Sequence, residues 1–173
     1  MIRRILVNFV LIVLCFVAQT SLFRVLSILG CSPNLLLIFV VSTGVMRGDI
    51  AGLFTGFFSG LLCDCFSGSV VGLFALIYMF AGFVCGKYRK SFYPENMMQP
   101  LSIIAVSDFV FGLLNFSLFF LLRGRTNFLF YLFRVIFPEL IYTLLAALIL
   151  YPVILIINTK LEDIESRSER KFV

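Results

Sequence analysis

The segment GVMRGDIAGLFTGFFSGLLCD, residues 44–64, places a glycine at every fourth position from Gly44 to Gly60. In water, each glycine inside a helix costs about 1 kcal/mol relative to alanine, so such a helix would be poor. In a lipid bilayer, helices associate by close packing, and small residues four apart let two backbones approach. Because a helix has about 3.6 residues per turn, we expect Gly52, Gly56 and Gly60 to share one face.

This glycine face has two possible partners. It can pack against other helices of the same chain, or part of it can receive a transmembrane helix from another protein. The candidate residues for helix packing or partner binding are Gly52, Gly56, Phe57 and Gly60. Gly44 is expected to belong to the preceding element.

The composition indicates an integral membrane protein. Of the 173 residues, 61% are hydrophobic and only 13% are charged, whereas a soluble domain usually has about 25% charged residues. The chain has no histidine, which removes the usual general base and the commonest metal ligand. Cys63 and Cys65 lie two residues apart, so on a helix they point away from each other. We therefore expect no metal site, no cofactor and no enzymatic activity.

The apolar stretches predict an all-α, polytopic fold, with a six-helix transmembrane domain over residues 1–159 and a charged tail over 160–173. One helix from 33 to 66 would be about 50 Å long, but the hydrocarbon core is only about 30 Å thick. We therefore predict two short spans joined by a polar turn at Arg47-Gly48-Asp49. The predicted spans are residues 5–23, 34–46, 50–66, 70–85, 100–122 and 137–158.

The basic residues predict the orientation of the bundle. Six spans place both termini on one side, and most of the 14 lysines and arginines fall on that side. The excess of basic residues in cytoplasmic loops therefore predicts cytoplasmic N- and C-termini. The formal net charge of +5 is explained by topology and by contacts with anionic membrane lipid, so no nucleic-acid partner is expected.

Three acidic residues lie within or at the edge of apolar spans, where a charge needs a structural reason. Asp64 ends the third span and Glu139 opens the sixth, so either could cap a helix, or both could share a polar cluster with Arg134. Asp108 lies about two turns into the fifth span, and we expect it to be either neutral or hydrogen-bonded to a polar partner such as Asn115. A proton or ion relay needs several such groups in a line, which the sequence does not provide.

Residues 52–72, GLFTGFFSGLLCDCFSGSVVG, resemble the signature of the rod-shape-determining MreD family. The shared pattern is a G-x-x-x-G-F-x-x-G-x-x-x-D core, a Ser-Gly-Ser turn and a glycine four residues after the glycine of that turn. The Pro33-Asn34 opening of the second span and the polar loop before the fifth are also similar to that family. The matching residues are Gly52, Gly56, Phe57, Gly60, Asp64, Ser67, Gly68, Ser69 and Gly72.

The resemblance implies a non-enzymatic scaffold in the bacterial inner membrane, within the complex that elongates the cell wall. It implies as partners MreC, the MreB filament, the RodA glycosyltransferase and the elongation transpeptidase. It also implies a bundle similar to the substrate-binding subunits of energy-coupling-factor transporters. The alternative function is thus a small-molecule binder of the vitamin type, which needs an enclosed pocket with converging polar groups.

These features suggest a binding mechanism. The glycine face is expected to accept a transmembrane helix, that of MreC. Asp64 is expected to fix the outer end of the third span through hydrogen bonds to the backbone of the turn Ser67, Gly68 and Ser69. The Arg47 turn and the loop that begins at Lys87 are expected to face MreB or lipid head groups.

Overall fold

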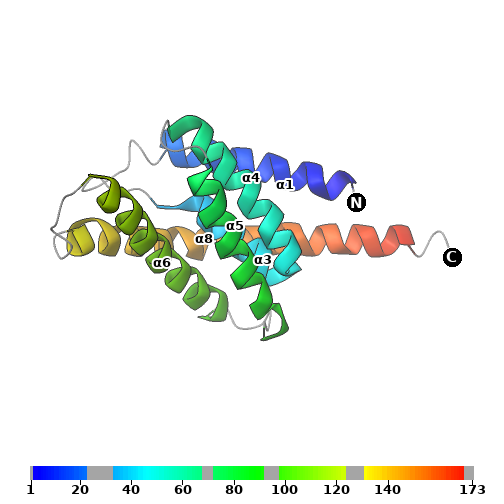
Figure 1. The fold of residues 1–173 in the computed structure, drawn as a ribbon. Helices are drawn as coiled ribbons and strands as arrows, with labels where there is room; N and C mark the ends of the chain where they lie inside the picture. Colours follow the sequence, from blue (N-terminus) through cyan, green and yellow to red (C-terminus); the bar gives the residue numbers. More distant parts are fainter. Residues whose placement is uncertain (1, 23–32, 68–71, 92–97, 124–130, 170–173) are drawn as a thin grey trace.

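The computed structural model describes residues 2–22, 33–67, 72–91, 98–123 and 131–169, and in these residues every element is helical (Figure 1). The expectation of an all-helical protein is therefore confirmed for the described part of the chain. The six long helices are α1 (Ile2–Val17), α3 (Leu35–Arg47), α4 (Asp49–Ser67), α5 (Leu73–Lys87), α6 (Met98–Arg123) and α8 (Phe137–Glu169). The shorter turns are η1 (Ala18–Leu22), η3 (Tyr88–Ser91) and η4 (Leu132–Ile136).

Four of the six helices are long and apolar enough to cross a membrane. Their apolar stretches are Arg4–Ser21, Asp49–Phe66, Met98–Ser117 and Leu132–Glu162. The helices α3 and α5 have only 13 and 15 residues, which is about 20–23 Å at 1.5 Å per residue. Six helices occur where six spans were predicted, and a full crossing by the two short ones remains a prediction.

The core is organised around α3, which contacts α1, α4, α5, α6 and α8. Every residue from Leu35 to Val45 is buried, as expected for a helix that is apolar on all sides. The hydroxyls of Ser42 and Thr43 donate to the carbonyls one turn back, of Ile38 at 2.6 Å and Phe39 at 2.8 Å. These bonds satisfy the two polar side chains within the helix.

The chain reverses direction between α3 and α4 at a single residue, Gly48. Its φ of 101° lies in the left-handed region, which residues with a Cβ rarely adopt. The backbone N–H of Gly48 donates to Gly44 at 2.7 Å, and Gly48 accepts from Gly52 at 3.0 Å. The turn therefore lies where the sequence Arg47-Gly48-Asp49 predicted it.

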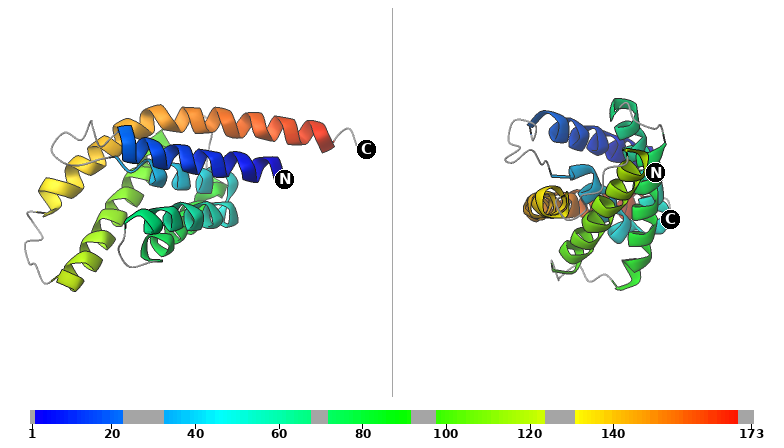
Figure 2. Two further views of the ribbon diagram at one scale, coloured as in Figure 1. Left: turned by 90° about the horizontal axis from the view of Figure 1, so that it is seen from above. Right: turned by 60° about the vertical axis from the view of Figure 1, so that its left-hand side comes forward.

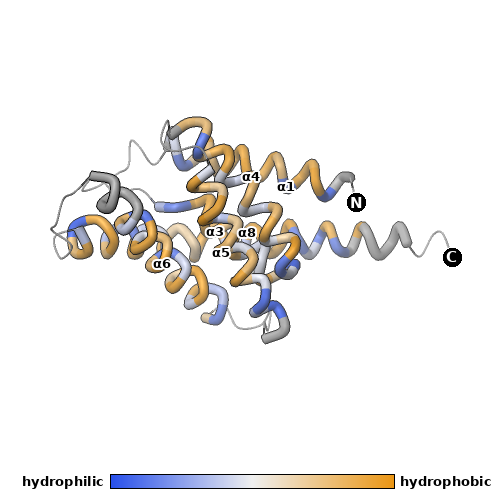
Figure 3. The backbone as a smooth tube through the Cα atoms, viewed as in Figure 1, coloured by the Kyte–Doolittle hydropathy of each residue, from blue (hydrophilic) through white to orange (hydrophobic). Residues whose placement is uncertain are grey.

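The last helix extends beyond the bundle, and both termini lie at the same end (Figures 1 and 2). Residues 160–169, expected as a tail, continue α8 to Glu169. This helix contains Pro152, which cannot donate the usual backbone hydrogen bond, and the helix is bent along its length (Figure 2). Figure 3 shows apolar residues along all the helices, with hydrophilic residues mostly near their ends.

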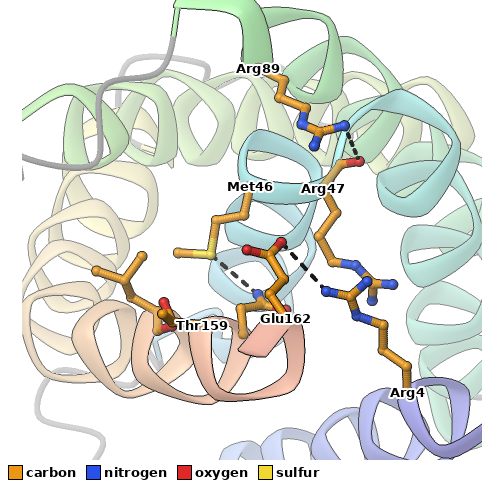
Figure 4. A network of polar contacts seen from close by, with 8 residues as sticks. Arg4, Met46, Arg47, Arg89, Thr159 and Glu162 are labelled. Carbon is orange, nitrogen blue, oxygen red and sulfur yellow. Dashed lines mark hydrogen bonds and ion pairs between the residues drawn. The ribbon is translucent and has the colours of Figure 1, made fainter. Parts of the chain in front are cut away.

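One end of the bundle gathers basic side chains and is called here the basic end (Figure 4). Arg4 of α1 forms an ion pair with Glu162 of α8 at 3.4 Å. The guanidinium of Arg89 donates to the backbone carbonyl of Arg47 at 3.1 Å. The start of α1, the α3–α4 turn, the end of α5 and the late part of α8 therefore meet at one end.

Candidate functional site

The glycine face of α4 packs against α5 of the same chain. A methyl group added to Gly52 would lie 2.8 Å from the carbonyl carbon of Gly82. One added to Gly56 would lie 2.6 Å from the carbonyl carbon of Tyr78, and one added to Gly60 would lie 2.6 Å from the backbone nitrogen of Ala75. Real Cβ atoms do not come this close to backbone atoms, so only glycine permits this antiparallel contact.

Two further glycines extend the contact to α3 and to the turn. A methyl group on Gly44 would lie 2.7 Å from the carbonyl oxygen of Gly82, and one on Gly86 would lie 2.6 Å from the carbonyl carbon of Gly48. Gly44 lies in α3, the element to which the sequence assigned it. Three backbones thus meet without intervening side chains, and α3 and α5 cover the glycine face within the chain.

Phe57 points away from this contact. Its side chain is 37% exposed and packs edge-on against Phe58, with the ring centroids 5.7 Å apart. Phe54 and Leu61 are also exposed on α4. The side of α4 that carries Phe57 is therefore exposed, whereas Gly52, Gly56 and Gly60 are covered by α5.

Asp64 caps the helix that follows its own. It is 3% exposed, and its Oδ2 accepts hydrogen bonds from the backbone N–H groups of Gly72 and Ala75, both at 3.0 Å. Its Oδ1 accepts from the N–H of Phe74 at 3.1 Å. The first N–H groups of a helix have no partner within the helix, so Asp64 satisfies the start of α5.

The expected contact between Asp64 and the Ser-Gly-Ser turn falls mostly on residues that the structure does not describe. Ser67 is the last residue of α4, and Gly68 and Ser69 lie outside the described residues. The bonds that the structure describes are made to the residues from Gly72 onward. Gly72 has a φ of 97° and lacks a side chain, so the capping acceptor comes from Asp64.

A second polar cluster lies where α3 begins. Oδ1 of Asn34, which is 3% exposed, accepts from the Tyr78 hydroxyl at 2.7 Å and from the backbone N–H of Leu37 at 3.2 Å. The N–H of Asn34 donates to the Thr143 hydroxyl at 3.3 Å. From η1, the side-chain oxygen of Gln19 accepts from the N–H of Leu36 at 3.2 Å. Side chains from three other elements thus support the buried start of α3.

The two remaining acids belong to this cluster. Asp108 is 4% exposed, and its Oδ1 is buried without a hydrogen bond. Glu139 lies within electrostatic range of Asp108. The hydrogen bonds that the structure describes for Asp64 all go to the start of α5. The cluster of Asp64, Glu139 and Arg134 stays a prediction.

Asn115 was the partner expected for Asp108, and its side-chain oxygen is buried without a hydrogen bond. Among the residues that the structure describes, no group of three or more Cys, Asp or Glu could hold a metal ion. Cys15, Cys63 and Cys85 are buried or half-buried thiols, and Cys65 is exposed.

Several residues of these two sites were not identified from the sequence. Gly82 and Gly86 form a second pair of small residues four apart, the same signal that identified Gly52 and Gly56. Tyr78 and Thr143 carried no such signal, because a lone hydroxyl in an apolar helix does not indicate its partner.

The apolar helices, the backbone-to-backbone packing and the satisfied helix termini define a helical integral membrane protein. The family model described as rod shape-determining protein MreD matches residues 1–160, which include all six helices up to the late part of α8. The chain therefore belongs to the MreD family, and that family implies a role in determining rod shape. Comparison with curated proteins and with solved structures gave no match.

Proposed function

We propose that the protein is a non-enzymatic scaffold subunit of the bacterial cell-elongation complex, located in the cytoplasmic membrane. The observation that carries the proposal is the family match over residues 1–160, because it spans the whole bundle and not one motif. The proposed partners are MreC, MreB, RodA and the elongation transpeptidase. In this role, the bundle is a rigid platform, and its rigidity comes from the glycine packing and the Asp64 cap.

The basic end is proposed to face the cytoplasm, with all six helices crossing the membrane. Support comes from Arg4, Arg47 and Arg89, which lie at one end together with the termini, since cytoplasmic ends of membrane proteins are rich in lysine and arginine. A cysteine introduced at Lys160 should react with a membrane-impermeant maleimide only in inverted vesicles, in a background from which the five native cysteines have been removed. Reaction in intact spheroplasts would contradict this orientation.

The contact with the transmembrane helix of MreC is proposed to lie on the exposed side of α4, at Phe57. The glycines of α4 support this contact indirectly, because they hold α4 against α5 and so fix the direction of Phe57. Replacement of Phe57 by alanine should weaken co-purification of MreC while expression is kept. Gly56→Leu should lower expression and co-purification together, because it disturbs the folding of the bundle itself.

The proposal is tested by a pull-down from gently solubilised membranes, with mass spectrometry of both the proteins and the small molecules. Recovery of wall-synthesis proteins supports the scaffold function. Recovery of an ATPase module with a retained vitamin would instead indicate the alternative, a binding subunit of a transporter. Asp64→Ala belongs in the same assay, and an unchanged complex would argue against a role of the α4–α5 connection in assembly.

A further inference from the structure

An apolar groove runs along the side of the bundle between α5 and α6. Its volume is about 320 Å³, and its floor is formed by the buried side chains of Ile77, Cys85 and Phe111. Its rims include Phe80 and Val106, which are 59% and 64% exposed. The groove therefore opens sideways, toward the surface that a bilayer would cover.

Hydrogen bonding and ring packing hold the two walls of the groove together at its floor. The Cys85 thiol and the Ser107 hydroxyl are 3.1 Å apart, and the rings of Tyr78 and Phe111 pack with centroids 5.0 Å apart. Contacts between α5 and α6 are otherwise sparse, and α6 leans away from α5 (Figure 1). The floor of the groove is thus held in place by contacts between α5 and α6.

The length of the groove matches one leaflet of a membrane. On α5 it runs from Tyr88 to Ile77, which is about 16 Å at 1.5 Å per residue. Half of a hydrocarbon core is about 15 Å. One end of the groove bears Tyr88 and Ser102, and tyrosine is the kind of residue that lies at a membrane interface.

The groove is long relative to its volume. About 320 Å³ is spread over roughly three turns of α5. A slender, flexible hydrocarbon chain can lie along this shape.

The interfacial end of the groove carries positive charge. Lys87 and Arg89 flank Tyr88 in the chain, and with Gly48, Asp49 and Gly86 they line an open depression of about 550 Å³. The Lys87 ammonium lies 4.7 Å from the centre of the Phe83 ring. Arg89 is held by its bond to the Arg47 carbonyl, which uses one of the five N–H donors of a guanidinium. Two cations and the carboxylate of Asp49 thus line a depression next to Tyr88, the residue at the end of the groove.

We propose that the α5–α6 groove binds one acyl chain of an anionic glycerophospholipid whose phosphate contacts Lys87 and Arg89. The positive charges of Lys87 and Arg89 favour an anionic head group. The groove is about as long as one leaflet is thick, so we expect the lipid to come from the leaflet on the side of the basic end. This site goes beyond the scaffold function, because it needs no other protein. It would give the bundle a bound lipid that covers the sparse α5–α6 contact.

The test uses the full-length protein in vesicles of phosphatidylethanolamine that contain a minor share of phosphatidylglycerol with a photoactivatable group in one acyl chain. After illumination, the labelled peptides are mapped by mass spectrometry. Labelling should concentrate on residues 77–88 and 102–114. Equal labelling of the other exposed apolar faces, such as Phe9 on α1 or Phe54 on α4, would overturn the proposal.

Variants separate the chain from the head group. Val106→Phe adds bulk on an exposed rim and should abolish most of the groove labelling, whereas the matched change Leu76→Phe, at an exposed site of α5 outside the groove, should leave it unchanged. Circular dichroism verifies that both variants fold. If Val106→Phe labels as strongly as Leu76→Phe, the groove does not hold the chain.

The double variant Lys87→Gln/Arg89→Gln should reduce the preference for phosphatidylglycerol over an equally labelled phosphatidylethanolamine by roughly fivefold for each charge removed. The control, Lys160→Gln/Lys171→Gln, removes the same charge from the C-terminal segment and should preserve the preference. An equal loss in both variants would overturn the assignment of the head group to Lys87 and Arg89.

A transmembrane helix of another protein is the competing occupant. A photocrosslinking amino acid placed at Val106 in living cells distinguishes the two, because a bound lipid gives no protein adduct. A discrete protein adduct at Val106, with none at Leu76, would show that a helix fills the groove and would overturn the proposal. Absence of a protein adduct at Val106, together with a positive control at Phe57, supports the lipid.

Discussion

The carboxylate of Asp64, in the last turn of α4, accepts a hydrogen bond from the backbone N–H of Ala75, in the first turn of α5, at 3.0 Å. The same carboxylate accepts from Gly72 and Phe74. A carboxylate at a helix N-terminus is also stabilised by the helix dipole. One side chain thus satisfies the start of α5 and fixes the distance between two helices that Gly56 and Gly60 allow to touch.

Replacement of Asp64 by alanine should destabilise the bundle more than any change of an exposed acid. The substitution removes the acceptor of three N–H groups, of which that of Ala75 is buried and those of Gly72 and Phe74 are partly buried. A buried unsatisfied group costs about 1–3 kcal/mol. We expect a clear fall in the midpoint of thermal unfolding in detergent, followed by far-UV circular dichroism, since the chain has no tryptophan to report by fluorescence.

The control for this prediction is Glu162→Ala. Glu162 forms an ion pair with Arg4 at 3.4 Å, but its side chain is 59% exposed, and exposed ion pairs contribute only about 0–1 kcal/mol. If both variants unfold at the same temperature, the three hydrogen bonds to Asp64 do not stabilise the bundle.

Gly56→Ala should destabilise the protein although alanine is the better helix former. Alanine improves an exposed helix by about 1 kcal/mol relative to glycine, but here its methyl group would overlap the backbone of Tyr78 and Met79 in α5. Backbone atoms of a packed helix cannot turn aside, so a net loss of about 1–3 kcal/mol is expected from overpacking. The same unfolding measurement checks it.

Gly112→Ala is the matched control, because it is the same change in another transmembrane helix. Its methyl group would lie 3.3 Å from Cγ1 and Cγ2 of Ile136, a side chain that can shift by a few tenths of an ångström. We expect a neutral or slightly stabilising effect. A similar loss at Gly112 and Gly56 would mean that the close α4–α5 approach is not the source of stability.

Much of the fold could be predicted from the sequence, because local signals decide it. The apolar stretches of the sequence predict the positions of the helices, and the polar residues around Gly48 predict the turn between α3 and α4. The partner of the glycine face could not be predicted in this way. Small residues on a helix indicate that another backbone packs there, but they do not identify that backbone. The helix that packs against α4 has its own pair of small residues, Gly82 and Gly86. How the glycines of α4 align with those of α5 depends on the tertiary structure.

The polar sites show the same division. Asp64 was identified because a charge in an apolar span needs a reason, and the reason lies close in sequence, at Gly72 and Ala75. Asp108 and Glu139 are separated by a long stretch of chain, so their proximity depends on how α6 crosses α8. Depth in the membrane, which the sequence gives approximately, does not determine which helices are neighbours.

Tyr78→Phe tests the cluster at the start of α3. The change removes a hydroxyl that donates to Asn34 at 2.7 Å inside the core and keeps the ring that packs against Phe111. A net hydrogen bond contributes about 0.5–1.5 kcal/mol, and a loss of this size is expected. Tyr88→Phe is the control, since Tyr88 is 57% exposed. Equal stability of the two variants would contradict a structural role for the Asn34–Tyr78 bond.

The same substitution should have opposite effects at the two buried aspartates. Asp64→Asn replaces a group with two acceptor oxygens by an amide that has one acceptor and an NH₂ group. That NH₂ group would face the N–H groups of α5, so part of the cap is lost and stability should fall.

At Asp108, one carboxylate oxygen is buried without a hydrogen bond. An amide is less costly to bury than a charged group, so Asp108→Asn should leave stability unchanged or raise it. Unfolding of the two variants side by side measures the difference. A large loss of stability in Asp108→Asn would mean that the carboxylate itself is required at this position. The cluster would then do more than support the start of α3.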